Sequence, residues 1–201
     1  VLLPLEQTGV DFWWIDWQQG EALFAGSPTP EINPTWWLNY VYYTQPDGRA
    51  ARTAGAETAG AETAGAETAV AETAGAEGRQ RRQPARRRLI MHRYGGLGNQ
   101  RYPIGFSGDV SASWESLAFQ PHFTASAANV NFGWWSHDIG GFYEPIDGEL
   151  FTRWVQSGVF SPILRAHGFR RVEIEKRFWY YGHEYFAPLR AALRTRLELL
   201  P

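Results

Sequence analysis

The 201-residue sequence contains no cysteine, which excludes a disulfide framework and a metal site built on thiolates. It has no excess of one charge, because 19 Lys and Arg stand against 21 Asp and Glu. A protein that binds nucleic acid through a basic face normally shows a surplus of positive charge, so we expect no nucleic-acid partner. No apolar run approaches the roughly 20 residues of a membrane-spanning helix, and we expect no membrane span.

One segment differs in composition from the rest of the sequence. Residues 51–87 begin with a pentad repeat of the type AETAG, whose period matches neither a helix nor a strand. The recurring glycines weaken any helix there by about 1 kcal/mol each relative to alanine. We predict a low-complexity, disordered insertion at 51–87 between two structured parts, 1–50 and 88–201. The arginines that close the segment could also be interpreted as a nucleic-acid tail or a localisation signal.

Outside this insertion, short apolar runs alternate with helical patterns. The five strand candidates are residues 9–16, 88–93, 104–109, 129–138 and 159–167. Helical stretches are predicted from Pro34, over 111–128 with an interruption at Pro121, over 147–158 and from His183 to the end. Such alternation is typical of a parallel sheet covered by helices, which gives an α/β fold. We expect most of the ten tryptophans to lie in the core, among them Trp36, Trp37, Trp154 and Trp179.

Each strand candidate ends in a polar or charged residue. These residues are Asp16, Arg93, Asp109, Asp138 and His167. In a (β/α) barrel, functional side chains lie at the carboxyl ends of the strands, so this pattern favours a barrel. A doubly wound sheet also binds ligands at strand ends, but the GGLG at 95–98 lacks the spacing of its phosphate-binding turn. A helix cap is the alternative interpretation of any one of these residues.

The candidates for catalysis are Asp16 and Asp109. Hydrolysis of a glycosidic bond needs one ionised carboxylate at the reacting carbon and one protonated carboxyl that protonates the leaving oxygen. Both aspartates have aromatic neighbours in the sequence, and apolar surroundings raise the pKa of a carboxyl, as a general acid requires. Asp16 as a buried structural acid, and Asp109 as a helix N-cap, remain the alternatives.

Four motifs carry a resemblance to a known family. They are GVDFWWIDWQQG, RYPIGFSGD, GWWSHDIGGF and FSPILRAH, in this order along the chain. Together they resemble the catalytic barrel of glycoside hydrolase family 31, the retaining α-glucosidases and α-xylosidases. The resemblance implies a partial (β/α)8 TIM barrel that comprises roughly strands 4 to 8 with their helices. It also implies that Asp16 is the nucleophile and Asp109 the general acid/base.

The same resemblance implies roles for other residues. Arg93, Asp138 and His167 are expected to bind sugar hydroxyls. Trp14, Phe106, Trp135 and Phe142 are expected to wall the pocket, and Arg165 to support the nucleophile from behind while bordering the substrate. The family needs no cofactor, and none is expected. His137 beside Asp138 invites a metal interpretation, but the five histidines show no metal-ligand spacing, so we predict no metal site.

The sequence departs from the common family pattern in two places. Trp17, Gln18 and Gln19 follow Asp16 where many members have Met or Phe, then Asn and Glu, and Val110 follows Asp109 where Thr or Asn is frequent. The departure after Asp16 leaves the accepted sugar open among α-glucosides, α-xylosides and α-galactosides. Hydrolysis and transglycosylation also remain alternatives.

The chain supplies five strand candidates, whereas a barrel has eight. We therefore expect a fragment whose parent protein contributes further barrel strands and N- and C-terminal domains. A non-catalytic piece with at most weak carbohydrate binding is the alternative to an active α-glycosidase. The sequence begins with Val, so we expect the start to be missing, and the cellular location stays open.

Overall fold

The computed structural model describes residues 2–16, 31–45, 88–93 and 96–200. These residues form one sheet of four parallel strands, in the order β1-β2-β3-β4. The strands are β1 Trp13–Ile15, β2 Ile90–His92, β3 Ile104–Phe106 and β4 Trp134–Ser136. The fold is therefore α/β with a parallel sheet, as predicted. The segment 51–87, for which we predict a disordered insertion, lies outside the described residues.

The fifth strand candidate pairs only weakly with the sheet. Within 159–167, isolated parallel bridges join Ile163 to Ser136 and Ala166 to Ile139, so this run lies beside β4. Pro162 has no N–H to contribute to a ladder, which is one reason the run does not form a regular strand. The arrangement is a section of a (β/α) barrel in which β1 to β4 follow one another in sequence order.

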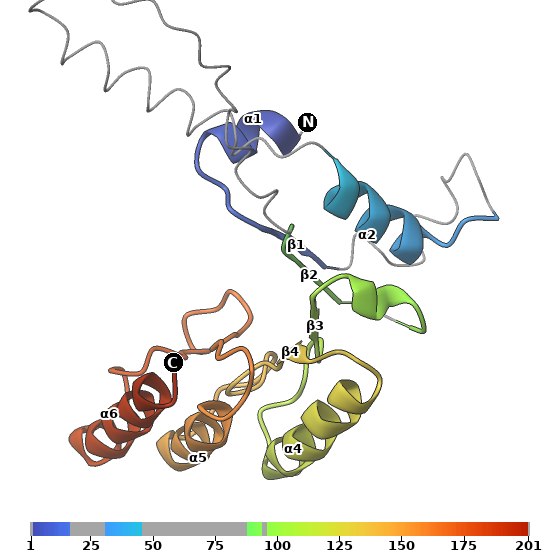
Figure 1. Cartoon of the computed structure of the whole chain (residues 1–201). Coiled ribbons are helices and arrows are strands. Elements are labelled where there is room, and N and C mark those ends of the chain that lie inside the picture. Colours follow the sequence, from blue (N-terminus) through green and yellow to red (C-terminus); the bar gives the residue numbers. More distant parts are fainter. Residues whose placement is uncertain (1, 17–30, 46–87, 94–95, 201) are drawn as a thin grey trace, which may run out of the picture.

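Six helical segments accompany the strands in the described part of the chain. They are α1 Leu2–Gln7, α2 Pro34–Thr44, the 3-10 helix η3 Asn99–Arg101, α4 Trp114–Asn129, α5 Gly148–Gly158 and α6 His183–Glu198. The last three lie side by side in a row near the β4 end of the sheet, whereas α1 and α2 lie near the end formed by β1 and β2 (Figure 1). In the described residues of the connection from β2 to β3, 93 and 96–103, the one helical element is the short η3.

Side-chain caps explain where three helices begin. Asn33, Ser113 and Asp147 precede α2, α4 and α5, and each accepts a hydrogen bond from a backbone N–H of the first turn. Such a bond satisfies a donor that has no partner within the helix and contributes about 1 kcal/mol. The predicted interruption at Pro121 is wrong, because α4 continues through it. The sequence reasoning did not predict α1.

Buried side chains of α5 and α6, together with Ile139 and Val159, form the largest core cluster. It contains Ile139, Leu150, Phe151, Trp154, Val155, Val159, Leu189 and Ala192. A second cluster of Ile15, Ile90 and Tyr102 packs against α2 on the outer face of the sheet. The inner face carries Met91, Ile104 and Phe106. Side chains alternate between the two faces along each strand, so adjacent residues of a strand belong to different clusters.

The tryptophans divide differently from our prediction. Trp154 is completely buried, which confirms its place in the core. Trp36 and Trp37 are each 50% exposed and Trp179 is 67% exposed, so for these three the prediction is wrong. Composition counts apolar side chains, but only packing against a partner decides which of them leave water.

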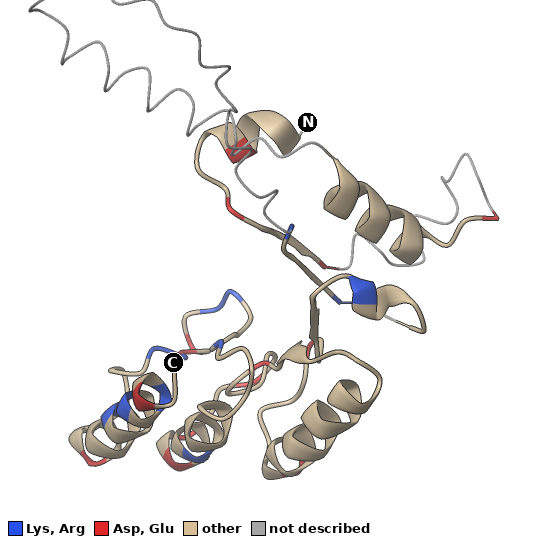
Figure 2. Ribbon diagram, in the orientation of Figure 1, with Lys and Arg blue, Asp and Glu red and all other residues tan. Residues whose placement is uncertain are grey.

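Positive and negative side chains are mixed over the described surface. Figure 2 shows Lys and Arg beside Asp and Glu on α5 and α6, where Glu149 and Arg153 form an i, i+4 pair. Such exposed pairs contribute little to stability. The mixture agrees with the balanced charge of the sequence.

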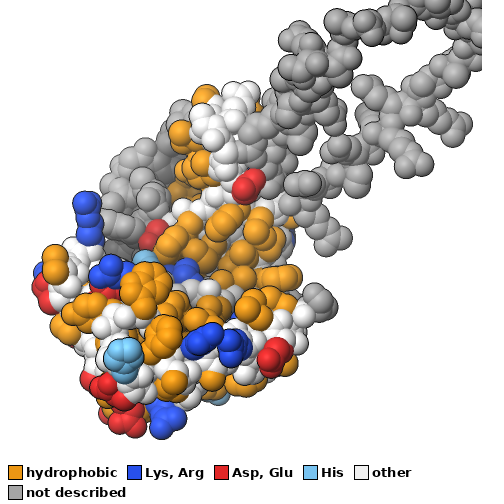
Figure 3. Space-filling view, turned by 90° about the vertical axis from the view of Figure 1, so that its left-hand side faces the viewer, with side chains coloured by type: hydrophobic (Ala, Val, Ile, Leu, Met, Phe, Trp, Pro, Cys, Tyr) orange, Lys and Arg blue, Asp and Glu red, His pale blue; other side chains and the backbone are white. Residues whose placement is uncertain are grey.

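Apolar side chains remain exposed around α6. Phe186 is 44% exposed and Leu197 is 69% exposed, and both border a groove of about 420 Å³ that also includes Trp179. Figure 3 shows hydrophobic side chains spread across the side of the molecule on which α6 lies. None of the helices among the described residues combines the length and hydrophobicity needed to cross a bilayer.

The core cluster leads to a stability prediction. Trp154 is fully buried, and its Nε1–H donates to Nδ1 of His137 at 3.2 Å. We expect Trp154→Ala to lower the free energy of unfolding by about 3 to 5 kcal/mol, because it leaves a cavity and an unpaired imidazole nitrogen. Urea denaturation followed by circular dichroism measures this change. Trp179→Ala is the exposed control and should stay within about 0.5 kcal/mol of the wild-type chain. Equal losses in the two variants would contradict the assignment of the core.

Candidate active site

Polar side chains converge at the carboxyl edge of the sheet. Asp16 and Arg93 directly follow β1 and β2, Asp109 lies three residues beyond β3, and Asp138 lies two residues beyond β4. His167 is the last residue of the run 159–167, which lies beside β4. Parallel strands end at one edge, so residues that are far apart in the sequence become neighbours there.

Arg93 joins the two candidate catalytic carboxylates. Its Nε donates to Oδ1 of Asp16, and its Nη2 donates to Oδ1 of Asp109 at 2.6 Å. All three side chains are between 15% and 25% exposed. Burial alone would lower the pKa of the Arg93 guanidinium, but its hydrogen bonds to the two aspartates and their charges outweigh this effect and raise that pKa above its ordinary value. Arg93 therefore stays charged and separates two like charges that would otherwise repel.

The shared guanidinium also limits the separation of the two carboxylates. An oxygen of Asp16 and an oxygen of Asp109 each lie within one hydrogen bond of the same planar group. Glycosidases use carboxyl separations of about 5 to 9.5 Å, depending on the stereochemical outcome. Asp16 and Asp109 thus lie close together at the carboxyl edge of the sheet, and their catalytic roles stay a prediction.

Asp138 and Arg165 form a second, more deeply buried ion pair. Asp138 is fully buried, and its Oδ1 accepts from Nη2 of Arg165 at 2.6 Å. Burial raises the pKa of Asp138 to about 6, although the charge of Arg165 acts in the opposite direction. Within the described part of the chain, Oδ2 of Asp138 and Nη1 of Arg165 have no hydrogen-bond partner. Buried polar atoms are normally paired, so these two atoms each lack a hydrogen bond that the described residues could supply.

Aromatic rings form a wall beside these ion pairs. The Trp14 ring lies 5.4 Å from Phe106 and 5.2 Å from His167, measured between ring centroids. Phe142 stacks on His167 at 5.1 Å, and the Arg165 guanidinium lies 4.8 Å above Trp14. Burial and the nearby Arg165 lower the pKa of His167 to about 4. His167 is therefore neutral near pH 7, and a neutral ring can donate one hydrogen bond and accept another.

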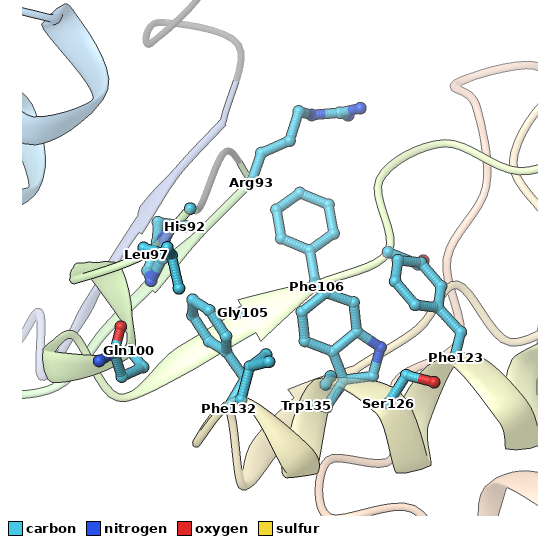
Figure 4. Close-up of a pocket in the computed structure, with 14 residues that line it drawn as sticks. His92, Arg93, Leu97, Gln100, Gly105, Phe106, Phe123, Ser126, Phe132 and Trp135 are labelled. Atoms are coloured by element: carbon cyan, nitrogen blue, oxygen red, sulfur yellow. The ribbon is translucent and has the colours of Figure 1, made fainter.

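Trp135 is not part of this wall. It packs on Phe123 of α4 at 4.9 Å and on Phe132 at 6.0 Å, on the outer face of the sheet. Figure 4 shows Phe123, Phe132 and Trp135 around a cavity of about 440 Å³, which Arg93 and Phe106 also border. Strand alternation places Trp135 on the face opposite to that of Ser136, and its expected contact with a sugar stays a prediction.

Arg165 has a different partner from the one expected. We predicted that it supports the nucleophile, but its two side-chain hydrogen bonds go to Asp138 and to Ser136, the latter at 3.1 Å. The structure thus places Arg165 behind Asp138 and above Trp14. Sequence reasoning could not assign this partner, because a lone arginine on a strand end carries no signal of which carboxylate it will meet.

Tyr143 is a site residue that the sequence reasoning missed. Its hydroxyl donates to Oδ2 of Asp109 at 3.2 Å. Gly141, at φ 72°, helps to bring this loop close, because a Cβ at that position would lie 2.6 Å from the backbone of Ala112. The GG pair at 140–141 was visible in the sequence, but nothing there indicated that the tyrosine two residues later reaches Asp109.

The site offers one group of possible metal ligands among the described residues. Asp109, Asp138 and His167 place ligand atoms within 4.8 Å of one another. Both carboxylates already accept from arginines, and these positive charges oppose a cation at the same place. His137 does not join the group, because it is buried on the outer face and bonded to Trp154 and to Ser161.

Comparison with known proteins places this site in a family. Residues 3–201 match the model of the glycosyl hydrolases family 31 TIM-barrel domain. The chain is 34% identical over 119 residues to alpha-glucosidase 2 of Bacillus thermoamyloliquefaciens, with 58% of this chain and 15% of that protein covered. It is 34% identical over 128 residues to an alpha-xylosidase of Saccharolobus solfataricus, with 61% of this chain and 17% of that protein covered. The chain thus spans less than a fifth of the length of these relatives.

Solved structures agree with this placement. The alpha subunit of glucosidase II, in its Tris-bound form, superposes with a TM-score of 0.54 at 34% identity and covers 60% of this chain and 13% of its own. A Flavobacterium johnsoniae dextranase covers 98% of this chain and 23% of its own with a TM-score of 0.60; at 22% identity it supports the fold alone. The chain belongs to glycosyl hydrolase family 31 and forms part of its TIM-barrel domain.

Proposed function

We propose that this chain carries the catalytic centre of a retaining glycoside hydrolase that acts on α-glycosidic bonds. The observation that carries the proposal is the Arg93 guanidinium, which binds Asp16 and Asp109 at once. Two carboxylates on one side of a sugar-sized space are the chemical requirement for cleavage of a glycosidic bond. The family membership supports the same reaction class.

The proposed reaction has two steps. Asp16 attacks the anomeric carbon, the bond from this carbon to the leaving oxygen breaks, and protonated Asp109 transfers its proton to that oxygen. A covalent glycosyl-enzyme on Asp16 results. Asp109, now ionised, then takes a proton from water, whose oxygen attacks the anomeric carbon and releases Asp16. Configuration is retained because two displacements occur at the same carbon.

The residues around the carboxylates suit a sugar. The unpaired Oδ2 of Asp138 accepts from a sugar hydroxyl, and the unpaired Nη1 of Arg165 donates to one. Trp14, which is 37% exposed, offers a partly open ring beside them, with His167 and Phe142 closing the wall. We assign Arg93, Asp138 and His167 to substrate binding.

The substrate class is proposed from the relatives. Their names include alpha-glucosidases and alpha-xylosidases, so an α-glucoside or an α-xyloside is the first choice, with α-galactosides and transglycosylation as alternatives within the family. Further barrel strands and flanking domains of a longer parent protein are the proposed partners of this chain, because it covers less than a fifth of those relatives.

A non-catalytic role for the isolated chain is the second candidate. The described sheet has four strands, and the groove beside α6 leaves apolar side chains in water. A four-stranded sheet has two edge strands that lack a partner on one side, and such edges hold the site less firmly. Displacement of a reacting group by 1 Å can lower the rate about a hundredfold. Sugar binding without turnover would favour this candidate.

Replacement of the proposed nucleophile tests the reaction. We expect Asp16→Asn to lower kcat for p-nitrophenyl α-glucoside by a factor on the order of 10⁴ or more, because an amide cannot form the glycosyl ester. Release of p-nitrophenol measures turnover. Glu173→Gln, at an exposed carboxylate, is the control and should keep wild-type kcat. Full activity of Asp16→Asn would refute the assignment.

The raised pKa of Asp138 predicts a pH dependence of substrate binding. Below about pH 6, Asp138 takes up a proton and loses the charge that pairs with Arg165 and accepts from the sugar. We expect KM to rise as the pH falls through about 6, and to stay flat above about 7. Arg165 lowers the pKa of Asp138, so Arg165→Met should move this rise to higher pH. Initial rates between pH 5 and 8 give KM, and the same KM over this range in the wild-type chain would contradict the prediction.

A further inference from the structure

We propose that Tyr143 is a positioning residue for Asp109 that holds this carboxyl in both of its protonation states. The inference rests on the proposed function, in which Asp109 serves first as acid and then as base. Tyr143 lies on the loop that follows β4, directly after the motif GWWSHDIGGF.

Asp109 has two hydrogen-bond partners of different character. Its Oδ1 accepts from Arg93 at 2.6 Å, and its Oδ2 accepts from the Tyr143 hydroxyl at 3.2 Å. A guanidinium has only donors, so Arg93 can bind only an oxygen that carries no proton. A phenol both donates and accepts. Tyr143 can therefore donate to ionised Asp109 and, after rotation of its hydroxyl, accept from protonated Asp109.

The surrounding backbone fixes this contact. The N–H of Phe142 donates to the carbonyl of Val110 at 2.6 Å, and the N–H of Ala112 donates to Oε2 of Glu144 at 2.9 Å. These two bonds flank the Tyr143 contact on the loop after β4 and connect it to the loop that carries Asp109. Tyr143 is thus held on both sides by loop-to-loop hydrogen bonds, although its ring is 53% exposed.

This geometry matters most in the first step of the reaction. The proton on Oδ2 of Asp109 can point to the Tyr143 oxygen until a glycosidic oxygen takes its place as acceptor. The proton then moves to the leaving oxygen as the bond to the anomeric carbon breaks, and the Tyr143 hydroxyl turns to donate to the new carboxylate. Without the hydroxyl, Oδ2 of Asp109 loses the one hydrogen bond that orients it in the described part of the site.

A comparison of two leaving groups separates a role in proton transfer from a loss of stability, because a destabilised structure would lower kcat/KM for both substrates alike. Maltose has a leaving group that needs a proton, whereas α-glucosyl fluoride releases fluoride with little need of one. We expect Tyr143→Phe to lower kcat/KM for maltose about tenfold, a fraction of the 10² to 10⁴ that general acid catalysis contributes, and to change kcat/KM for the fluoride by less than about twofold.

The control is Tyr40→Phe, at a tyrosine that is also 53% exposed but lies on α2. It should leave both values unchanged. Equal losses on the two substrates, or no loss on either, would overturn the role of Tyr143. If the wild-type chain cleaves neither substrate, the proposed function fails for this chain, and a second measurement decides the contact without turnover.

That measurement follows the Tyr143 phenol by NMR with ¹³C-labelled tyrosine in the full chain. Burial and the negative charge of Asp109 raise the pKa of Tyr143 above its ordinary value. We expect Asp109→Asn to lower the pH at which the Cζ resonance of Tyr143 titrates, and Glu149→Gln, at an exposed carboxylate that is not among the groups that shift this pKa, to leave it in place. An unchanged titration in Asp109→Asn would overturn the proposal.

Discussion

The bridge that Arg93 forms between Asp16 and Asp109 is the interaction on which the site depends. Two carboxylates at close range repel each other, and one charged guanidinium between them makes the arrangement stable. The three residues come from three neighbouring strands, so the bridge exists only because β1, β2 and β3 lie side by side in parallel. The order of the strands in the sheet therefore places the arginine between the two carboxylates.

The alternation of side chains along short strands separates two functions of the sheet. Inward positions carry the apolar residues Met91 and Ile104 below the charged strand ends, whereas outward positions pack against helices. Asp138 is buried and Arg165 is 15% exposed, and this low solvent access strengthens their attraction and raises the cost of unpaired atoms. A sugar that supplies the missing hydrogen bonds would remove this free-energy cost and would therefore bind more tightly.

Much of the fold could be predicted from local patterns. Strand runs with polar ends and capped helices were readable because each depends on a few adjacent residues, and four of the five predicted runs contain strands. The predicted strands were too long, and 159–167 forms only bridges. An apolar run indicates burial but does not say how many of its residues find a hydrogen-bonding neighbour. For the same reason Trp36 and Trp37, which are half exposed, could not be distinguished from buried Trp154.

The sequence by itself determined the class of fold and the types of polar residue that follow the strands, since periodicity and the residues that end a run are local properties. Only the tertiary structure decided that Trp135 faces α4, that Arg165 pairs with Asp138, and that Tyr143 reaches Asp109. Each of these contacts joins residues between 12 and 34 positions apart. Their geometry depends on strand register and on how two loops meet, and neither is encoded in the pattern of any one segment.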